Sequence, residues 1–211
     1  MKKAIFFDLD GTLWDALDSL TKSWNETCKN NNLPYFFSYE LMKSFMGLTP
    51  KETIELVFND VDYKKGEEYF KLCLNDEIVY LEKNPGKLYL NEEEILKKLA
   101  KKYSLFIVSN SDQGYIEDFL KAYDFNKYFV DHLCYGDLKL EKYQNILYLK
   151  NKYQIDEVIY VGDTLKDYKE SSKAGVKFIH AAYGFGKIDD KVHAINSLNE
   201  LEKEITKVFN E

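Results

Sequence analysis

Short β-rich runs alternate with helical stretches along the chain, and this alternation restricts the fold more than any other feature of the sequence. Four runs are clear and a fifth is weaker: Ala4–Phe7, Leu105–Val108, Val158–Val161, Lys177–His180 and, less distinct, Val192–Ile195. Parallel strands need long connections, and helices supply them. The sequence therefore predicts an α/β fold with a Rossmann-like parallel sheet flanked by helices.

The stretches between these runs contain helix start and stop signals. Asn91 is predicted as the N-cap of a helix whose apolar face begins at Ile95, and Gly175 is expected to end the helix before Val176. Both helices fall between predicted strands, as crossover connections in a parallel sheet would.

Residues 15–84 break the alternation. They contain helical stripes, such as the one formed by Leu17, Leu20 and Trp24, and no convincing strand. Within them, Thr49–Glu52 has the pattern of a capping box with proline at the first helical position. This interval is therefore predicted to be a helical insertion.

The insertion defines the predicted domains. Pro85-Gly86 marks the return to the sheet, so residues 1–14 and 85–211 are assigned to an α/β core domain. Residues 15–84 are assigned to an all-helical cap domain inserted after the first strand. Six large side chains are expected in the core or at the seam between cap and core rather than in a specificity pocket: Trp14, Tyr35, Phe36, Phe37, Phe45 and Met46.

The charge of the chain limits its partners. There are 29 basic and 36 acidic residues, which give a net charge of −7 and argue against nucleic acid as the main partner. All of the basic residues are lysines, so no guanidinium group is present to bind phosphate in two-pronged fashion. Any phosphate must be held by lysine, hydroxyls, backbone N–H groups or a metal ion.

The sequence shows no signal for export or membrane insertion. The apolar run Ala4–Phe7 is too short for an export signal, and no later segment approaches the roughly 18 apolar residues of a membrane helix. Cys28, Cys73 and Cys134 are odd in number and widely spaced, which is typical of reduced, mostly buried thiols. We expect a cytoplasmic protein without a membrane partner, whose oligomeric state the sequence does not indicate.

Polar side chains follow the predicted strands. They are Asp8 and Asp10 after the first, Ser109 and Asn110 after the second, Asp163 and Asp167 after Val158–Val161, and Lys142 at the start of the preceding helix. Ligands of open parallel α/β sheets bind beyond the carboxyl ends of the strands, so these residues should converge on one edge.

Four carboxylates at one edge would repel one another by about 4 kcal/mol per pair at 4 Å and an effective dielectric near 20. A hard divalent cation with oxygen ligands would offset that repulsion, and Mg²⁺ suits a site that also receives a phosphate. The predicted metal-binding residues are Asp8, Asp10, Asp163 and Asp167.

In this order, the segment Asp8–Leu13, then Ser109, Lys142 and the segment Gly162–Asp167 resemble the four motifs of the haloacid dehalogenase superfamily. The resemblance spans nearly the whole chain. The helical insertion resembles the small cap of one branch, and Ala181–Gly186 is similar to a loop of phosphoglycolate phosphatase-like members. The resemblance implies a Mg²⁺-dependent phosphatase that acts on a small soluble phosphomonoester.

The resemblance also implies roles. Asp8 would be the nucleophile that forms an aspartyl-phosphate, and Asp10 would be the general acid and base. The spacing of these two acids agrees, because residues two apart in a strand point to the same face. Asp163 would bind Mg²⁺ directly together with the Asp8 carboxylate and the Asp10 backbone carbonyl, while Asp167 would act directly or through a water.

The phosphoryl oxygens would be held by Ser109, the N–H of Asn110 and Lys142. Thr12 is expected to hydrogen-bond within the turn at Gly11, and it is also counted among the phosphate-binding residues. Lys139 lies close enough in the sequence to take the place of Lys142.

Other interpretations stay open. Asp167 also fits a capping box that begins at Thr164, which is a structural role. A mutase of the β-phosphoglucomutase type would use the same core motifs, and phosphoryl transfer to a sugar phosphate would reveal it. A signalling domain that accepts a phosphoryl group without turnover fits less well, because Asp10 and the insertion have no place in it.

Overall fold

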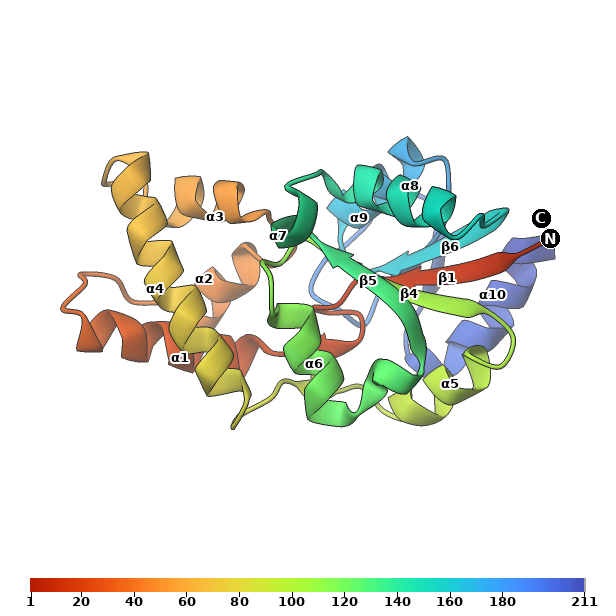
Figure 1. Cartoon of the computed structure of the whole chain (residues 1–211), viewed down its shortest axis with the longest axis horizontal. Helices are drawn as coiled ribbons and strands as arrows, with labels where there is room; N and C mark the ends of the chain where they lie inside the picture. The colour runs from red at the N-terminus through yellow and green to blue at the C-terminus, as the bar shows by residue number, and fades with distance from the viewer. Residues whose placement is uncertain (211) are drawn as a thin grey trace.

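A six-stranded parallel sheet forms the centre of the computed structural model, which describes residues 1–210 (Figure 1). From edge to edge the strands are β5 (Phe129–Cys134), β4 (Ser104–Ser109), β1 (Lys3–Phe7), β6 (Glu157–Gly162), β7 (Lys177–Ala181) and β8 (His193–Ile195). Every pair of neighbours is parallel. The predicted α/β fold is confirmed.

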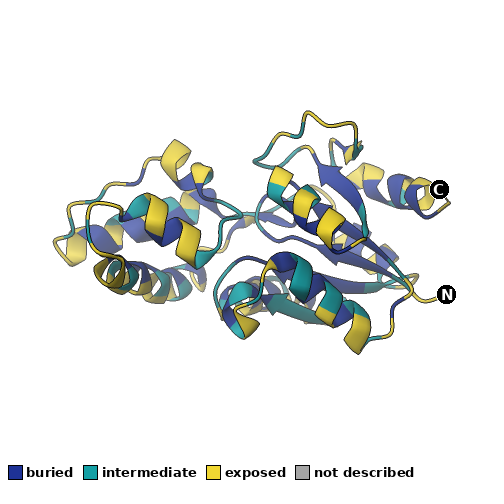
Figure 2. Ribbon diagram, turned by 90° about the horizontal axis from the view of Figure 1, so that it is seen from above, coloured by how far each residue is buried: buried dark blue, intermediate teal, exposed yellow. Residues whose placement is uncertain are grey.

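Helices cover both faces of the sheet (Figure 1). One face packs against α8 (Lys142–Lys152) and α9 (Leu165–Lys173), and the other against α5 (Glu92–Leu99), α6 (Tyr115–Tyr123) and α10 (Leu201–Asn210). Adjacent strand residues point to opposite faces, so Phe6 packs in one apolar cluster and Phe7 in the other. Both faces of β1 are therefore buried, as Figure 2 shows for the centre of the sheet.

One strand of the sheet, β5, was not predicted. It lies at the edge, and the run Phe129–Cys134 is interrupted by Asp131 and His132. The Asp131 side chain accepts hydrogen bonds from Lys152 Nζ and Tyr153 Oη, both at 2.8 Å. An edge strand can hold such polar residues, and the continuous apolar run that reveals a buried strand is then missing.

Four helices form a separate lobe beyond one end of the sheet (Figure 1). They are α1 (Leu17–Asn30), α2 (Tyr39–Ser44), α3 (Pro50–Val57) and α4 (Tyr63–Leu81), and we call residues 17–81 the helical lobe. Its centre is Trp24, whose ring lies 5.1 to 5.8 Å from the rings of Phe37, Phe45 and Phe70. The expected helical content of this interval is thus observed.

Two short strands connect the helical lobe to the sheet. β2 (Trp14–Asp15) and β3 (Lys87–Leu88) pair in antiparallel fashion, so the chain passes into and out of the lobe side by side. Gly86 lies against Trp14, where an added Cβ would come within 2.8 Å of the indole ring. The turn at Pro85-Gly86 therefore needs glycine at its second position.

One prediction about local structure is wrong, and a second, the N-cap at Asn91, is confirmed in position but not in its side-chain bond. Phe36 is 77% exposed rather than in the core, because in the irregular segment between α1 and α2 its neighbour Phe37 is buried instead. Asn91 does precede α5, but with a φ of 62° its side chain makes no cap and donates to Asn199 instead. The Glu92 side chain accepts a hydrogen bond from the Tyr89 N–H, which lies before the helix.

Other local predictions are confirmed. Thr49 and Glu52 form the capping box of α3, and Gly175 follows α9 with a φ of 65°. The three cysteines are buried free thiols. Between residues 1 and 210, the structure contains no helix with the length and apolar character needed to cross a membrane.

Candidate active site

The carboxyl ends of three neighbouring strands bring the candidate site together. Asp8 follows β1, Ser109 ends β4 and Asp163 follows β6. β1 pairs with both other strands, and Phe7 lies opposite Ile107 on one side and Val161 on the other. The chain extends the sheet in opposite directions from this point, which is where ligands bind in open α/β sheets.

Three carboxylates meet at this edge. Asp8, Asp163 and Asp167 are each at most 3% exposed, and one oxygen of each lies within 4.8 Å of the others. Asp163 Oδ2 accepts hydrogen bonds from the N–H groups of Phe185 at 2.7 Å and Gly186 at 3.3 Å. Its other oxygen, Oδ1, is buried without a partner among residues 1–210. Burial and the charges of Asp167 and Asp8 raise the pKa of Asp163 well above its ordinary value.

Lys142 is the cation of the cluster. Its Nζ donates to Asp8 Oδ1 at 2.8 Å and to Asp167 Oδ1 at 2.6 Å, and its side chain is 1% exposed. Burial alone would lower the pKa of Lys142, but Asp167 and Asp8 raise it well above its ordinary value. Lys139 instead pairs with Asp112 at 3.5 Å and is 62% exposed. The structure thus places Lys142, and not Lys139, among the acids.

Asp167 has two roles in the structure. Its Oδ2 accepts from the N–H and Oγ1 of Thr164 and completes a capping box at the start of α9, while Oδ1 faces Lys142. The capping role of Asp167 is therefore confirmed, and it does not exclude a role in metal binding.

The cluster has more negative than positive charge. Three carboxylates face one ammonium group, and burial with the charge of Asp167 raises the pKa of Asp8 to about 7. The unpartnered Asp163 Oδ1 and the oxygen-only acceptors fit a small hard divalent cation. Asp8, Asp163 and Asp167 could hold Mg²⁺ here.

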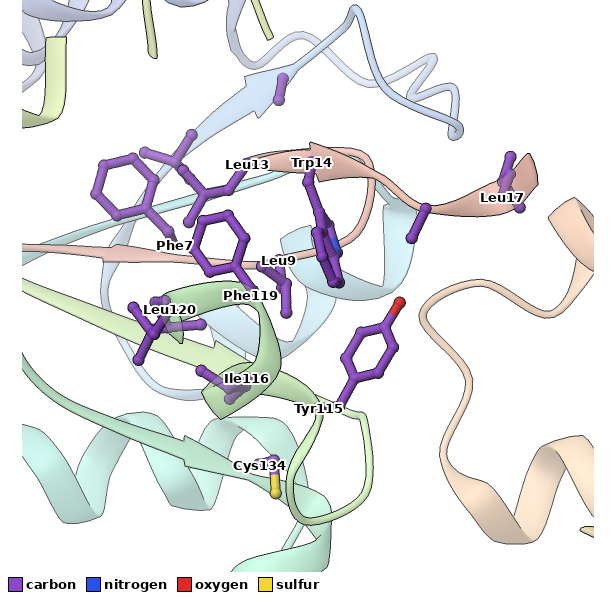
Figure 3. Close-up of a cluster of buried hydrophobic side chains, with 14 of the residues drawn as sticks. Phe7, Leu9, Leu13, Trp14, Leu17, Tyr115, Ile116, Phe119, Leu120 and Cys134 are labelled. Atoms are coloured by element: carbon purple, nitrogen blue, oxygen red, sulfur yellow. The ribbon is translucent and has the colours of Figure 1, made fainter. Parts of the chain in front are cut away.

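The side chain of Asp10 is held outside this cluster. Its Oδ1 accepts hydrogen bonds from Tyr115 Oη at 2.8 Å and Trp14 Nε1 at 3.0 Å (Figure 3 shows these two rings side by side). Burial raises the pKa of Asp10 to about 6, against the opposing effect of these two bonds. Both bonds end on Oδ1, and neither uses Oδ2.

The turn after Asp10 is closely packed. Gly11 has a φ of 74°, and a Cβ there would lie 2.3 Å from Asp163 Oδ2. The Thr12 backbone oxygen accepts from Tyr183 Oη at 2.7 Å, while Thr12 Oγ1 is buried and has no partner within the described chain. Thr12 does not line the cavity described next.

A cavity of about 300 Å³ lies between the acids and the helical lobe. From the sheet it is lined by Asp8, Asp10, Ser109, Asn110 and Tyr115, and from the lobe by residues that include Trp24, Phe45, Met46, Phe70, Lys71 and Glu77. Phe45 and Met46, expected only as core or seam, thus also line the pocket. Sequence analysis singled out neither Tyr115 nor Glu77.

The helical lobe contacts the sheet next to this cavity. Asn110 Nδ2 donates to the Gly47 carbonyl at 2.8 Å, and Lys166 of α9 pairs with Glu52 of α3. Ser109 Oγ accepts from the Ser111 N–H at 3.2 Å. The segment between α2 and α3 therefore lies over the strand ends.

Comparison with known proteins finds a family and relatives that cover most of this chain. The model of the family described as haloacid dehalogenase-like hydrolase matches residues 5–181. Phosphoglycolate phosphatase from Haemophilus influenzae is 27% identical over 199 residues, covering 87% of each chain. The enzyme of that name from Aquifex aeolicus is 27% identical over 196 residues, covering 90% of this chain and 89% of the relative. A predicted phosphoglycolate phosphatase from Haemophilus somnus, 24% identical, superposes with a TM-score of 0.79 over 97% and 98% of the two chains.

Proposed function

The chain belongs to the haloacid dehalogenase-like hydrolase family and is a phosphoric monoester hydrolase, and on this premise we propose that it is a Mg²⁺-dependent phosphatase of a small phosphomonoester. The observation that supports this best is the position of Asp8. Its carboxylate lines the cavity and lies beside Lys142, Asp163 and Asp167. Catalysis would proceed through a phosphoryl group on Asp8.

In the first step, an oxygen of Asp8 forms a bond to phosphorus while the bond between phosphorus and the leaving oxygen breaks. Asp10 Oδ2 gives its proton to that leaving oxygen. A group with a pKa of about 6 suits this work, since it can both hold and release a proton near neutral pH.

In the second step, Asp10 takes a proton from water. The water oxygen bonds to phosphorus, and the Asp8–phosphorus bond breaks with release of inorganic phosphate. Trp14 and Tyr115 hold Asp10 in one position through both steps, because their bonds to Oδ1 do not use the oxygen that exchanges the proton.

We assign the phosphoryl oxygens to Ser109, the backbone N–H of Asn110 and Lys142, with Thr12 supporting the turn beneath them. We assign Mg²⁺ to Asp8, Asp163 and Asp167, with the Asp10 backbone carbonyl. The bound ion would supply positive charge that favours the ionised form of Asp8 and offsets the charge of the phosphate.

We propose that residues 15–84 are a cap domain and residues 1–14 and 85–211 the core. The Asn110–Gly47 hydrogen bond and the Lys166–Glu52 ion pair support a cap that covers the substrate and excludes bulk water. The three buried, unpaired thiols support a reducing compartment, and we place the protein in the cytoplasm.

The test is phosphate release from a panel of phosphomonoesters that includes phosphoglycolate, with Mg²⁺ or with EDTA. Asp8→Asn should lower turnover by at least about 10³-fold. Asp189→Asn, at an exposed position, is the matched control. Near-normal activity of Asp8→Asn would exclude the covalent route. Phosphoryl transfer to a sugar phosphate would identify a mutase, and a long-lived phosphoprotein without turnover would identify a signalling domain.

A further inference from the structure

A buried acid faces the cavity from the helical lobe. Glu77 of α4 is 5% exposed and lines the same cavity as Asp8 and Asp10. Trp24 Nε1 donates to Glu77 Oε2 at 2.5 Å. In residues 1–210, Glu77 Oε1 accepts no hydrogen bond and neither oxygen has a lysine or histidine partner. Glu77 Oε1 is therefore free to accept a hydrogen bond from a group that enters the cavity.

The wall around Glu77 offers little positive charge. Lys71 is the one lysine among the residues described as lining the cavity, and it is 63% exposed and paired with Glu67 at 3.2 Å. Asp112 adds another acid to the wall, and its partner Lys139 is 62% exposed and is not part of the lining. A leaving group with its own negative charge would lose water here without gaining a counter-charge.

Glu77 lies on the leaving-group side of the reaction. Asp10, which we assign to the leaving oxygen, lines the same cavity, and after burial its charge contributes to raising the pKa of Glu77 to about 8. Tyr115, which donates to Asp10, also lies within the electrostatic influence of Glu77. A leaving group that extends from Asp10 into the cavity therefore has Glu77 among the side chains around it.

We propose that Glu77 is a specificity-determining residue that accepts a hydrogen bond from a hydroxyl or ammonium group of the leaving group, and that the cavity disfavours leaving groups with a second negative charge. This assignment depends on the proposed phosphatase function. It differs from what the names of the phosphoglycolate phosphatase relatives suggest, since glycolate carries a carboxylate.

The test compares kcat/KM for four substrates with Mg²⁺: ethanolamine phosphate, glycerol phosphate, phosphoglycolate and p-nitrophenyl phosphate. In the wild type, ethanolamine phosphate or glycerol phosphate should exceed phosphoglycolate by at least about 10-fold. A preference for the first identifies an ammonium ligand, and a preference for the second identifies a hydroxyl ligand. Phosphoglycolate turned over as well as both would overturn the proposal.

Variants assign the preference to one side chain. Glu77→Gln keeps an acceptor for Trp24 but cannot ionise beside an ammonium group, so an ammonium preference should fall by about 10-fold while a hydroxyl preference should change little. Glu77→Leu should abolish either preference. Glu68→Gln, on the exposed face of the same helix, is the control. If Glu77→Leu folds and ranks the substrates as the wild type does, the proposal is wrong.

The generic substrate separates this proposal from the one on which it depends. Turnover of p-nitrophenyl phosphate with the wrong substrate ranking refutes only the role of Glu77. Absence of turnover with these four substrates and with the wider panel of phosphomonoesters refutes the phosphatase itself. The ranking of the wild-type enzyme is informative even if Glu77→Leu fails to fold.

Discussion

Asp163→Asn should stabilise the metal-free protein and abolish its response to Mg²⁺. Oxygens of Asp8, Asp163 and Asp167 lie within 4.8 Å of one another, and at that separation and an effective dielectric near 20 each pair of charges repels by roughly 3–4 kcal/mol. Lys142 bonds Asp8 and Asp167 but not Asp163. Two of the three repulsions therefore involve a carboxylate without a cation of its own.

Binding of a proton limits how much the buried Asp163 carboxylate can destabilise the folded protein. Holding a proton at pH 7.5 on a carboxyl whose ordinary pKa is 3.8 costs at most about 5 kcal/mol, at 1.36 kcal/mol per pH unit. Asparagine removes the charge, and its Oδ1 can still accept the N–H of Phe185. Because side chains and water relax around the wild-type charge, we expect a gain of about 2 kcal/mol, or about 4–8 °C in melting temperature.

The stability difference between Asp163→Asn and the wild type should depend on pH in one direction. Asp163 has a folded-state pKa above its unfolded-state value, so its penalty grows as pH rises from about 4 and stops growing above the folded-state pKa. The advantage of Asp163→Asn should therefore be larger at pH 8 than at pH 5.

Thermal unfolding followed by circular dichroism, in EDTA and in excess Mg²⁺, measures both effects. Mg²⁺ at 100 times its Kd should stabilise the wild type by about 2.7 kcal/mol and leave Asp163→Asn unchanged. Asp189→Asn, an exposed control, should melt like the wild type. The reasoning is refuted if Asp163→Asn and wild type melt together in EDTA, or if Mg²⁺ shifts both equally.

Three further substitutions test the assigned roles. Asp10→Asn should lower kcat by about 10²–10⁴-fold and leave labelled phosphoenzyme after acid quenching; unchanged turnover would contradict the role of Asp10 as acid and base. Tyr115→Phe removes a bond that lowers the pKa of Asp10, so the alkaline limb of the kcat/KM profile should move to higher pH, and a shift to lower pH would contradict this. Lys142→Met should cost about 3–5 kcal/mol in denaturant unfolding, whereas Lys139→Met should cost almost nothing; equal effects would mean that Lys142 does not neutralise the cluster.

The sequence was sufficient to predict which strand ends meet. Asp8, Ser109 and Asp163 are more than fifty residues apart in the chain, but each directly ends or follows an apolar run, and parallel strands present their carboxyl ends at one edge. The choice between Lys139 and Lys142 needed the structure. Lys139 follows α7 (Tyr135–Leu138) with a φ of 55°, whereas Lys142 begins α8 beneath the acids. The directions of these two lysine side chains can be told apart only when the backbone turn between them is known.

The partners of Asp10 were beyond sequence analysis for another reason. Tyr115 is separated from Asp10 by 105 positions. It is the first residue of the helix after Gly114, and the local sequence does not require a tyrosine at that position. Its hydroxyl reaches Asp10 because α6 packs against β2, with ring centroids of Trp14 and Phe119 5.3 Å apart. Such a contact follows from tertiary packing, and no local pattern records it.

Glu77, in contrast, had a signal that could have been read. The buried residues of α4 include Phe70, Cys73, Glu77 and Leu81, with spacings of three, four and four that trace one face of a helix. Glu67 and Glu68 fall off that face and pair with lysines in solvent. An acid inside an apolar stripe loses its hydration on folding. A hydrogen bond or a bound proton must then offset the free-energy cost of that loss. Trp24 Nε1 donates to one oxygen of Glu77, and we propose that a substrate group donates to the other.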